Sequence, residues 1–346
     1  MPETEPPKVT IVVTPREKWS ACRESLDSIL EHTTLPHRMV YVDGNSPAPV
    51  RRYVSERAED RGFEVIRTDR YLTPNEARLM GLARVETPYV VFVDNDVLVA
   101  PRWVDAMLEC AEETGAEVVS PVVCQGDPVH EIIHCAGGEC GVKEIQTEQG
   151  TELHLFERIA GQGRRIGELR TPLARKQTGL AEFHCLLATT ESARRPGAID
   201  PGILNTREHV DFCLNVSQAG GAIWLEPGSV VTYLHDRKLR ASDLPYFMLR
   251  WSDEWERRSL EHVVAKHGLS TEGTAGKRLR NVGWRRRQYL VGPAAERVAA
   301  LVPVGRLRWP TRELLVGVER RLNALLTRSH ARRSASAGGE GPRAGT

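Results

Sequence analysis

Two aspartates one residue apart, Asp94 and Asp96, follow the most hydrophobic stretch of the sequence, Tyr89 to Asp94. Carboxylates at the end of a buried strand are costly unless a cation neutralises them. Mg²⁺ or Mn²⁺ bridging to a phosphate would do so through the hard oxygen ligands that these metals prefer. The pair therefore indicates a metal and phosphate site, although Asp-x-Asp is common and also suits a solvated turn after a strand.

A second group of ionisable residues, Glu208, His209 and Asp211, opens a helical pattern that ends at Gly220-Gly221. A positioned carboxylate can act as a general base, and so can a histidine that titrates near neutrality. Acidic residues near a helix N-terminus are also favoured by the helix dipole alone. The types and spacing of these residues do not by themselves assign proton transfer to any of them.

A third pattern, His130-Glu131-Ile132-Ile133-His134, matches the H-E-x-x-H motif of zinc proteases. That motif needs a longer helix and a third ligand. Pro128 and Gly137-Gly138 leave barely two helical turns here, and Cys135 and Cys140 belong to no paired motif. Zinc is therefore the less favoured interpretation, and a loop is the preferred one.

The sequence predicts alternating strands and helices beneath these residues. Apolar and β-branched runs predict strands at Val9–Thr14, Met39–Asp43, Glu64–Thr68, Tyr89–Asp94 and Glu117–Val123, with helical patterns between them. Such alternation implies right-handed βαβ units in an open, mostly parallel α/β sheet with helices on both faces. Ligands bind at the carboxyl ends of such strands, which here carry Thr14-Pro15, Asp43 and Asp94-Asn95-Asp96.

The middle of the chain is less regular. Residues 124–180 predict loops and short strands over the edge of the sheet, and two further strands flank a turn at Pro227-Gly228. A long amphipathic helix is expected from about Leu244 to His267. Its Trp251 and Trp255, one turn apart, suit core packing more often than stacking on an acceptor sugar.

The balance of charge divides the chain in two. The whole sequence has 346 residues and a formal charge of +1, which argues against a general nucleic-acid binder. Residues 271–346 nevertheless hold 16 Lys+Arg against 5 Asp+Glu, so the first 270 residues are acidic. We expect a catalytic domain over residues 1–270, a basic helical extension over 271–330 and a disordered tail over 331–346.

The basic extension contains an amphipathic helix with Leu314, Leu315, Val318, Leu322 and Leu325 on one face. Such a helix can cover the catalytic domain, pair with a second subunit or lie on an anionic membrane, and packing or dimerisation is slightly favoured. Seven scattered cysteines, an N-terminus without signal-peptide character and the lack of a long apolar run predict a cytoplasmic protein. Membrane binding through the helix would place it at the inner face.

From about Val9 to His235 the sequence resembles the family 2 glycosyltransferases with the GT-A fold. Four segments in order carry the resemblance: IVVTPREKW, YVDGNS, NEARLMGLARVETPYVVFVDND and GAIDPGILNTREHVDFCLNVSQAGGAIWLEPGSVVTYLH. The resemblance implies an inverting, metal-dependent transfer of a sugar from a nucleotide donor, most often UDP-linked. The acceptor would be a hydroxyl of a saccharide, a lipid-linked glycan or a small molecule, with a protein or peptide as an alternative.

The resemblance also implies roles for individual residues. In the donor site, Asp43 would bind the uracil ring, and the other contacts would come from Thr14, Pro15, Arg78, Asp94 and Asn95. The metal, Mn²⁺ or Mg²⁺, would be held by Asp94, Asp96 and His235. Members of the family usually carry the catalytic base in a Glu-Asp pair, whereas this sequence has Glu208-His209 followed by Asp211.

This departure leaves three outcomes open: His209 is the base, Glu208 or Asp211 has taken its place, or catalysis is impaired. In the last case the protein would be a non-catalytic module that binds sugar nucleotides or glycans. A nucleotidyltransferase is a third class that uses paired aspartates on an α/β sheet. A nucleotidyltransferase would need a glycine-rich basic loop after the first strand, and the segment TPREKWS matches such a loop poorly.

Overall fold

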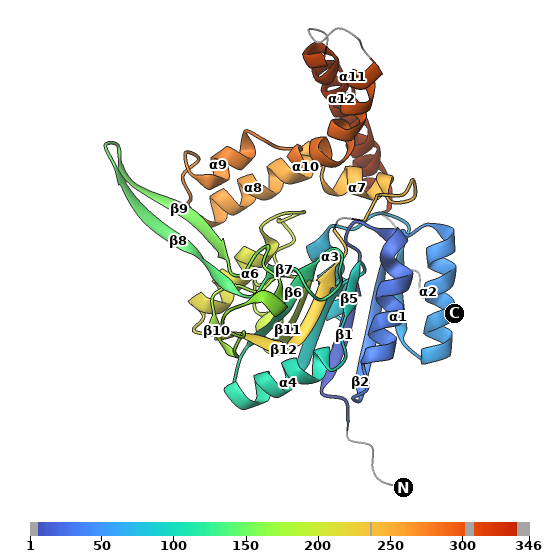
Figure 1. The fold of residues 1–346 in the computed structure, drawn as a ribbon, viewed down its shortest axis with the longest axis vertical. Coiled ribbons are helices and arrows are strands. Elements are labelled where there is room, and N and C mark those ends of the chain that lie inside the picture. The colour runs from blue at the N-terminus through green and yellow to red at the C-terminus, as the bar shows by residue number, and fades with distance from the viewer. Residues whose placement is uncertain (1–5, 236, 302–307, 338–346) are drawn as a thin grey trace.

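The computed structural model describes residues 6–235, 237–301 and 308–337. Over these ranges the chain forms a ten-stranded main sheet in the order β10-β12-β6-β11-β4-β1-β2-β3, with β5 beside β12 and β7 beside β6. A separate hairpin, β8-β9, projects from the body (Figure 1). The main-sheet strands are β1 (Val9–Thr14), β2 (His37–Gly44), β3 (Glu64–Thr68), β4 (Tyr89–Asp94), β5 (Val97–Val99), β6 (Val118–Gln125), β7 (Ile133–Cys135), β10 (Lys176–Thr178), β11 (Cys185–Thr189) and β12 (Ile223–Tyr233).

The N-terminal half of the sheet is parallel, as the alternating pattern predicts. β1 pairs in parallel with β2 and β4, and β2 pairs in parallel with β3. Every residue of β1 is buried, which is why its sequence is apolar and β-branched throughout. The helices that pack around the main sheet are α1 (Cys22–His32), α2 (Ala48–Arg61), α3 (Pro74–Leu82), α4 (Trp103–Thr114), α5 (Thr190–Arg194) and α6 (Glu208–Gln218).

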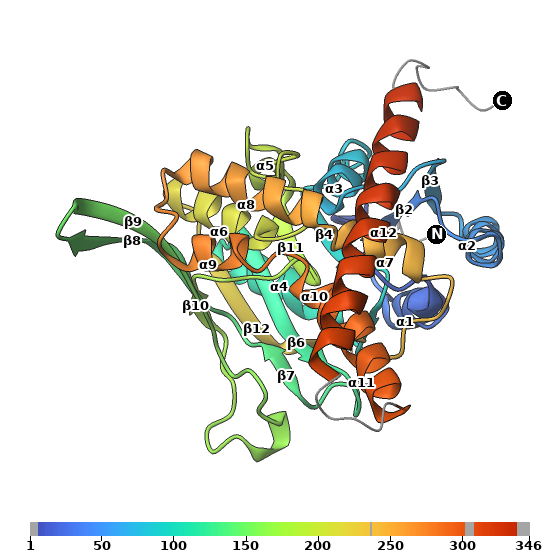
Figure 2. The same cartoon turned by 90° about the horizontal axis from the view of Figure 1, so that it is seen from above.

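Helices cover both faces of the sheet (Figure 2). α1 and α4 share one face, where Trp103 Nε1 donates a hydrogen bond to Thr33 Oγ1 across 3.1 Å. α3, α5 and α6 lie on the other, where Phe183 packs between the Phe92 and Phe212 rings. This layering leaves the carboxyl ends of the parallel strands open for a site.

The second half of the sheet is mixed. β11 runs antiparallel between β4 and β6, and β10 and β5 are antiparallel to β12. The two strands expected around Pro227-Gly228 form the single strand β12, whose register against β6 shifts between Glu226 and Val230. Proline lacks an N–H for the ladder, so these residues form an irregularity inside the strand where the pattern predicts a turn.

The region 124–180 is more ordered than its weak pattern predicts. It contains the ten-residue strands β8 (Gly138–Thr147) and β9 (Gly150–Ile159). The H-E-x-x-H segment forms no helix: His130 has a positive φ of 62°, and Ile133 and His134 belong to β7. The zinc-protease arrangement, two histidines on one helix face, is therefore excluded for this segment.

The C-terminal region is helical. The single helix expected from Leu244 to His267 is broken in two, because Trp251 ends α7 and the Ser252 side chain caps α8 by accepting from Trp255 N. The elements are α7 (Leu244–Arg250), α8 (Asp253–His267), α9 (Thr274–Leu279), α10 (Trp284–Arg286), a π-helical turn (Arg287–Val291), α11 (Gly292–Leu301) and α12 (Arg308–Ala337).

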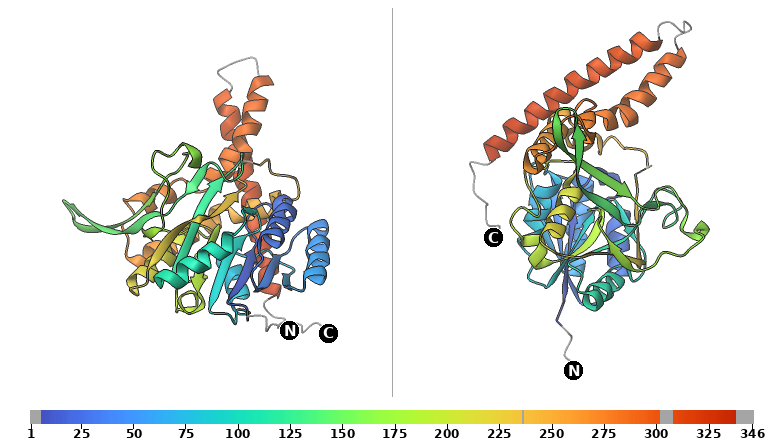
Figure 3. Two further views of the ribbon diagram at one scale, coloured as in Figure 1. Left: turned by 60° about the horizontal axis from the view of Figure 1, so that its bottom comes forward. Right: turned by 90° about the vertical axis from the view of Figure 1, so that its left-hand side faces the viewer.

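The α11–α12 pair extends beyond the sheet domain as a helical arm (Figure 3), and α12 also crosses the carboxyl end of the sheet near α3 and α7 (Figure 2). α12 continues to Ala337, into the segment for which composition predicts disorder. The rest of that expected tail, residues 338–346, lies outside the described residues. Among the helices of the described ranges, none combines the length and the apolar character needed to span a bilayer.

Candidate active site

A cavity of about 240 Å³ lies at the carboxyl ends of β1, β4 and β12. The segments that line it are far apart in the sequence, because parallel strands deliver their ends to one edge of the sheet. Apart from two tyrosines, the ionisable side chains that line it are those of Arg16, His134, Glu157, Glu182, His184, Arg207, Glu208, His209, His235, Arg278 and Arg285. Two of them, Arg278 and Arg285, come from the basic extension, so the C-terminal region completes the wall.

Asp94 lies beneath this cavity and is surrounded by basic groups. Its Oδ2 is 3.0 Å from Arg16 Nη1, and its Oδ1 is 3.6 Å from Arg78 Nη2. Asp94 is 1% exposed, and burial raises its pKa while Arg16 and Arg78 lower it. Arg78 itself is fully buried, with its guanidinium over the Phe183 ring, and burial lowers its pKa to about 10. Arg78 therefore supports Asp94 from below and does not face the cavity.

Asp96 differs from Asp94 because its carboxylate has no such partner. The residue is fully buried, and neither Oδ1 nor Oδ2 has a hydrogen-bond partner among the described residues. Burial raises the pKa of Asp96 to about 7, and the charge of Asp94 adds to the effect. An uncompensated buried carboxylate is a poor structural element but a suitable ligand for a divalent cation. The donor chemistry at Asp96 therefore fits the expected Mn²⁺ or Mg²⁺.

His235 follows β12 and lines the same cavity, as the resemblance implies for a metal ligand. The neighbouring backbone positions it: Leu234 N donates to Asp96 O across 3.1 Å, and Lys18 Nζ donates to the carbonyl of His235 across 2.6 Å. The ends of β4 and β12 are thereby tied together. Asp96 and His235 thus lie on adjacent segments.

Glu208 begins α6 and faces the cavity. Its Oε1 is 3.4 Å from Arg250 Nη2 and 4.0 Å from Arg78 Nη1. Burial would raise the pKa of Glu208, but Arg250 and Arg78 lower it below the usual value for glutamate. Glu208 is therefore an ionised carboxylate at neutral pH.

His209 also lines the cavity, but a carboxylate holds its ring. Its Nε2 is 2.7 Å from Glu157 Oε1, and Glu157 in turn pairs with Arg207. Burial would lower the pKa of His209, but the hydrogen bond and the charge of Glu157 raise it to about 9. The ring is therefore protonated at neutral pH.

Asp211 lies away from the cavity. One oxygen is 2.8 Å from Lys266 Nζ and the other is 2.7 Å from His267 Nε2. These contacts pack α6 against α8. Of the three candidates for the base, the structure brings Glu208 and His209 to the cavity and gives Asp211 a structural ion pair.

Of the residues expected to bind the nucleoside, Thr14 and Asn95 lie beside Asp94, whereas Asp43 is on β2, with β1 between it and β4. Asp43 accepts hydrogen bonds from Ser46 N (2.8 Å) and Ser46 Oγ (2.9 Å) and pairs with Arg67. Thr14 Oγ1 donates to Asp94 across 3.4 Å, and Asn95 Oδ1 accepts from Arg16 N across 3.0 Å. Thr14, Asp43 and Asn95 are each almost fully buried.

The C-terminal helices cover this side of the sheet. The Tyr246 hydroxyl of α7 donates to Leu72 O across 2.9 Å and lies 3.4 Å from Pro15 O. Tyr71 stacks on Tyr246 with 5.3 Å between ring centroids, and His330 of α12 contacts the Tyr71 carbonyl across 3.1 Å. A smaller cavity of about 190 Å³ remains between the loops after β2 and β3 and the end of α12.

Sequence reasoning missed several charged residues of the site. Arg16 lies in the segment TPREKWS, which gave no phosphate-binding pattern, and Arg285 lies in the Arg-rich segment WRRRQYL. Arg285 Nη2 is 3.2 Å from Glu17 Oε1 and 2.9 Å from the Tyr233 hydroxyl, and its guanidinium lies over the Trp251 ring at 4.6 Å. The aromatic residues beside Arg285 in the sequence were the pattern that could have identified it. Glu182 and His184 belong to no pattern in the sequence that could have identified them as site residues.

Residues 10–137 match the model of the family described as glycosyl transferase family 2. Over this segment the chain is similar to that family. Two curated relatives from Mycobacterium tuberculosis strains, both named pre-mycofactocin glycosyltransferase, are 24% identical to this chain over 234 residues. The alignment covers 67% of this chain and 44% of each relative, so the chain spans less than half the length of the curated proteins it matches.

The fold is shared with a solved structure. A crystal structure of GalNAc-T7 with UDP, GalNAc and Mn²⁺ aligns with a TM-score of 0.50 and 15% identity, over 75% of this chain and 51% of that one. A crystal structure of Staphylococcus aureus TarS residues 1–349 in complex with UDP covers 94% of this chain and 91% of its own, with a TM-score of 0.45 and 15% identity. The chain thus has the GT-A fold expected from its sequence, with a mixed sheet and a helical C-terminal region.

Proposed function

We propose that this protein transfers a sugar from a UDP-linked donor to an acceptor hydroxyl, with inversion and with a divalent cation bound at Asp96. The observation that carries the proposal is the uncompensated carboxylate of Asp96 beneath a cavity lined by arginines, in a family 2 GT-A domain. The GalNAc-T7 structure contains UDP and Mn²⁺, which favours the same nucleotide and metal here. When bound, the metal would stabilise the negative charge that develops on the leaving diphosphate.

The surrounding residues suit the parts of a nucleotide sugar. We assign Asp43, Thr14, Pro15 and Asn95 to the nucleoside end. Arg16 and Arg285 face the cavity and add positive charge where a diphosphate would lie. Asp96, Asp94 and His235 are the proposed metal set, of which Asp94 is the member already paired with arginine in this structure. Arg78 acts on the donor only through Asp94, because it is fully buried.

Among the candidates for the general base, we propose Glu208. An inverting displacement needs a group that accepts the proton of the acceptor hydroxyl on the face opposite the leaving group. Glu208 is ionised and faces the cavity, whereas His209 keeps its proton at neutral pH because of Glu157. His209 then serves as a cation in the acceptor half of the cavity, where it can donate a hydrogen bond to an acceptor oxygen.

We propose that the acceptor is a saccharide, a lipid-linked glycan or a small molecule. The polar side of α12 packs on the body, with Asn323 Nδ2 donating to Met248 O across 2.7 Å. Its apolar residues remain exposed, at 68% for Leu314 and 61% for Leu325, beside exposed Arg321 and Arg328. An apolar stripe flanked by arginines suits the surface of an anionic membrane, which favours a lipid-carried acceptor and a place at the inner face of the membrane.

The membrane proposal has a direct test in vesicle binding. We expect the full chain to sediment with vesicles that contain phosphatidylglycerol, and the substitution Leu322→Asp to reduce this binding at least tenfold. Ser329→Asp is the charge-matched control outside the stripe. Dimerisation that Leu322→Asp abolishes, without any vesicle binding, would instead identify the stripe as an interface between two copies.

A donor panel tests the proposed activity. The protein is incubated with UDP-, GDP- and dTDP-sugars and Mn²⁺, and release of the nucleoside diphosphate is measured with saccharide, peptide and pre-mycofactocin acceptors. We expect release from a UDP-sugar, and loss of metal-dependent donor binding in Asp96→Asn but not in the exposed control Asp60→Asn.

The other outcomes of the donor panel would point to different functions. Donor binding without release for any acceptor would favour a non-catalytic sugar-nucleotide module. Release of pyrophosphate from a nucleoside triphosphate would indicate a nucleotidyltransferase. Unchanged metal-dependent binding in Asp96→Asn would overturn the metal assignment.

A further inference from the structure

Two histidines and a glutamate converge on one point beside the cavity. His134 Nε2 is 3.1 Å from Glu182 Oε2, and His184 Nε2 is 3.3 Å from the same oxygen. One ligand atom from each of the three residues lies within 4.8 Å of the others. His134 comes from β7, whereas Glu182 and His184 directly precede β11. The site therefore joins two strands that are 50 residues apart in the chain.

The outer nitrogens of both rings face oxygen atoms. His134 Nδ1 is 3.0 Å from Gln125 Oε1, and His184 Nδ1 is 3.3 Å from Asp94 Oδ2. Both Nε2 atoms are thereby turned toward Glu182. Metal-binding histidines are oriented in this way, with one nitrogen on the metal and the other on a carboxylate or carbonyl oxygen.

The ring nitrogens of His184 do not both find hydrogen-bond partners among the described protein groups. The side chain is 4% exposed and lies between two carboxylates, those of Asp94 and Glu182. A neutral imidazole has one N–H, so it can donate to only one of them. The contact to Asp94 also lacks hydrogen-bond geometry, which leaves Nδ1 as a buried nitrogen without a hydrogen-bond partner among the described residues. A cation bound between the two Nε2 atoms and Glu182 would replace the hydrogen bond between His184 and Glu182. The single N–H of His184 could then be on Nδ1, toward Asp94.

We propose that His134, Glu182 and His184 bind a divalent transition metal, with Zn²⁺ as the best match. Two imidazole nitrogens and one carboxylate oxygen form the protein ligand set of an open zinc site, in which water or a ligand takes the remaining position. All three side chains line the cavity, so the open position faces it. Imidazole ligands suit Zn²⁺ and its neighbours, whereas the oxygen ligands at Asp96 suit Mn²⁺ or Mg²⁺.

The proposed site uses one histidine of the H-E-x-x-H segment and not the other. The backbone N and ring Nδ1 of His130 lie 2.7 and 2.8 Å from Thr232 Oγ1, so this residue is engaged elsewhere. His130 is therefore a matched control: it is the same residue type, four positions away, in the same segment.

Cobalt binding to the full chain tests the proposal. The protein is stripped with a chelator and titrated with Co²⁺, whose visible d–d absorption reports nitrogen and oxygen ligation, and then with Zn²⁺ by calorimetry. We expect one equivalent bound per chain, at least 100-fold weaker binding in His134→Ala and Glu182→Gln, and unchanged binding in His130→Ala. Gln125→Met should weaken binding about 10- to 100-fold through the orientation of His134.

Asp96→Asn separates this site from the proposed donor metal. It should leave the Co²⁺ spectrum intact while removing Mn²⁺-dependent donor binding. Folding of every variant is checked by circular dichroism, and Glu182→Gln keeps the size of the side chain. Absence of a Co²⁺ band with the folded wild-type protein, or an equal band in His134→Ala and wild type, would overturn the site.

Discussion

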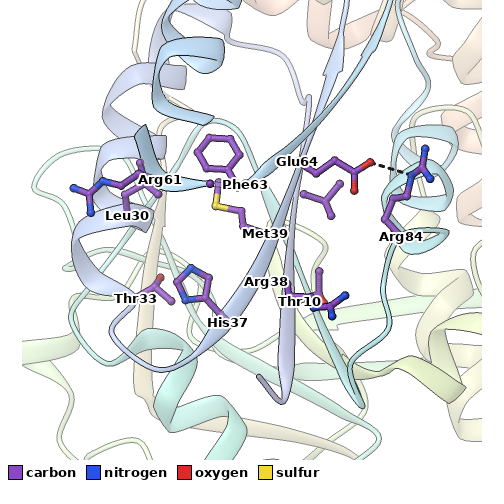
Figure 4. A pocket seen from close by; sticks show the side chains of 12 residues that line it. Thr10, Leu30, Thr33, His37, Arg38, Met39, Arg61, Phe63, Glu64 and Arg84 are labelled. Carbon is purple, nitrogen blue, oxygen red and sulfur yellow. Dashed lines mark ion pairs between the residues drawn. The ribbon is translucent and has the colours of Figure 1, made fainter. Parts of the chain in front are cut away.

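Two cavities lie at opposite edges of the main sheet, and they differ in how far their charged side chains are buried. The cavity at the amino ends of β1, β2 and β3 is the larger, at about 370 Å³, and Figure 4 shows its lining. Its ion pair, Glu64 with Arg84 at 3.1 Å, has side chains that are 46% and 58% exposed. In the central cavity Arg16, Glu182 and Glu208 are all buried.

The two cavities therefore differ in how their charges are buried, and the larger one is not the one that gathers buried charges. An exposed ion pair costs little and contributes little, because water already solvates both charges. A buried charge must be compensated by specific partners, and the central cavity arranges several such groups around Asp94 and Glu208. Within the described part of the chain the Asp96 carboxylate has no hydrogen-bond partner, and a bound metal would offset the cost of burying it. Substitutions at each end of the sheet test whether the two cavities differ in this way.

The largest effect is expected at Glu208. Replacing the carboxylate in Glu208→Gln should lower turnover about 10²- to 10⁴-fold, because the amide cannot accept the proton of the acceptor. Donor affinity should change little, and both are measured as diphosphate release over a range of donor concentrations. Glu64→Gln, at the opposite cavity, is the control and should keep full turnover. Near-normal turnover in Glu208→Gln, together with its loss in His209→Gln, would move the role to His209.

The next largest effect is expected on stability at Arg285. Arg285→Met leaves the buried Glu17 carboxylate without its partner from the extension, and breaking such a pair costs about 3–5 kcal/mol. Urea unfolding of the variant and the wild type measures the loss. The double variant Arg285→Met, Glu17→Gln should recover part of it, because no charge is then left uncompensated. A loss below about 1 kcal/mol would mean that the extension is not energetically part of the cavity wall.

A smaller and pH-dependent effect is expected at Glu157. The pKa of His209 is raised to about 9 by Glu157, so the stability that the pair contributes is present below pH 6.5 and is lost as pH rises through 9. Glu157→Gln should bring the pKa of His209 down to 6.5 or below. NMR titration of the ring measures the pKa, and unfolding at pH 6, 7.5 and 9 measures the stability. If the free energy of unfolding changed equally with pH in wild type and variant, the pairing of His209 with Glu157 would be contradicted.

The smallest effect is expected at the opposite cavity. Arg84→Met removes an exposed ion pair and should change the free energy of unfolding by less than about 1 kcal/mol. The same urea titration serves for this variant and for Arg285→Met. If the two variants lost equal stability, the distinction between the cavities would fail.

Much of the fold could be predicted from local pattern. The parallel half was predictable because apolar runs such as Val9–Thr14 are buried on both faces, and that burial leaves a continuous signal in the sequence. The hairpin β8-β9 was not, because its residues are mostly half-buried or exposed and so carry no clear alternation. The break between α7 and α8 was missed because Trp251 is buried and fits a helical stripe, while Ser252 marks a new helix start.

Parts of the candidate site could be predicted as well, but not its pairings. Asp94, Asn95 and Asp96 were identified because they end the most apolar strand, and Glu208 and His209 because they stand where the resembling family usually has a Glu-Asp pair. That Asp211 lies in a separate ion pair could not be read from its spacing, because Lys266 and His267 reach it from α8.

The sequence by itself determined which residue types end each strand, and hence that carboxylates gather at the carboxyl edge of an α/β sheet. Only the tertiary structure decided how those charges differ: Asp94 compensated, Asp96 uncompensated, Glu208 ionised and His209 protonated. The physical reason is that hydrophobic periodicity acts over a few residues, whereas the pKa of a buried group depends on partners from distant segments. Arg285 and Glu17 meet in the cavity wall although 268 positions separate them.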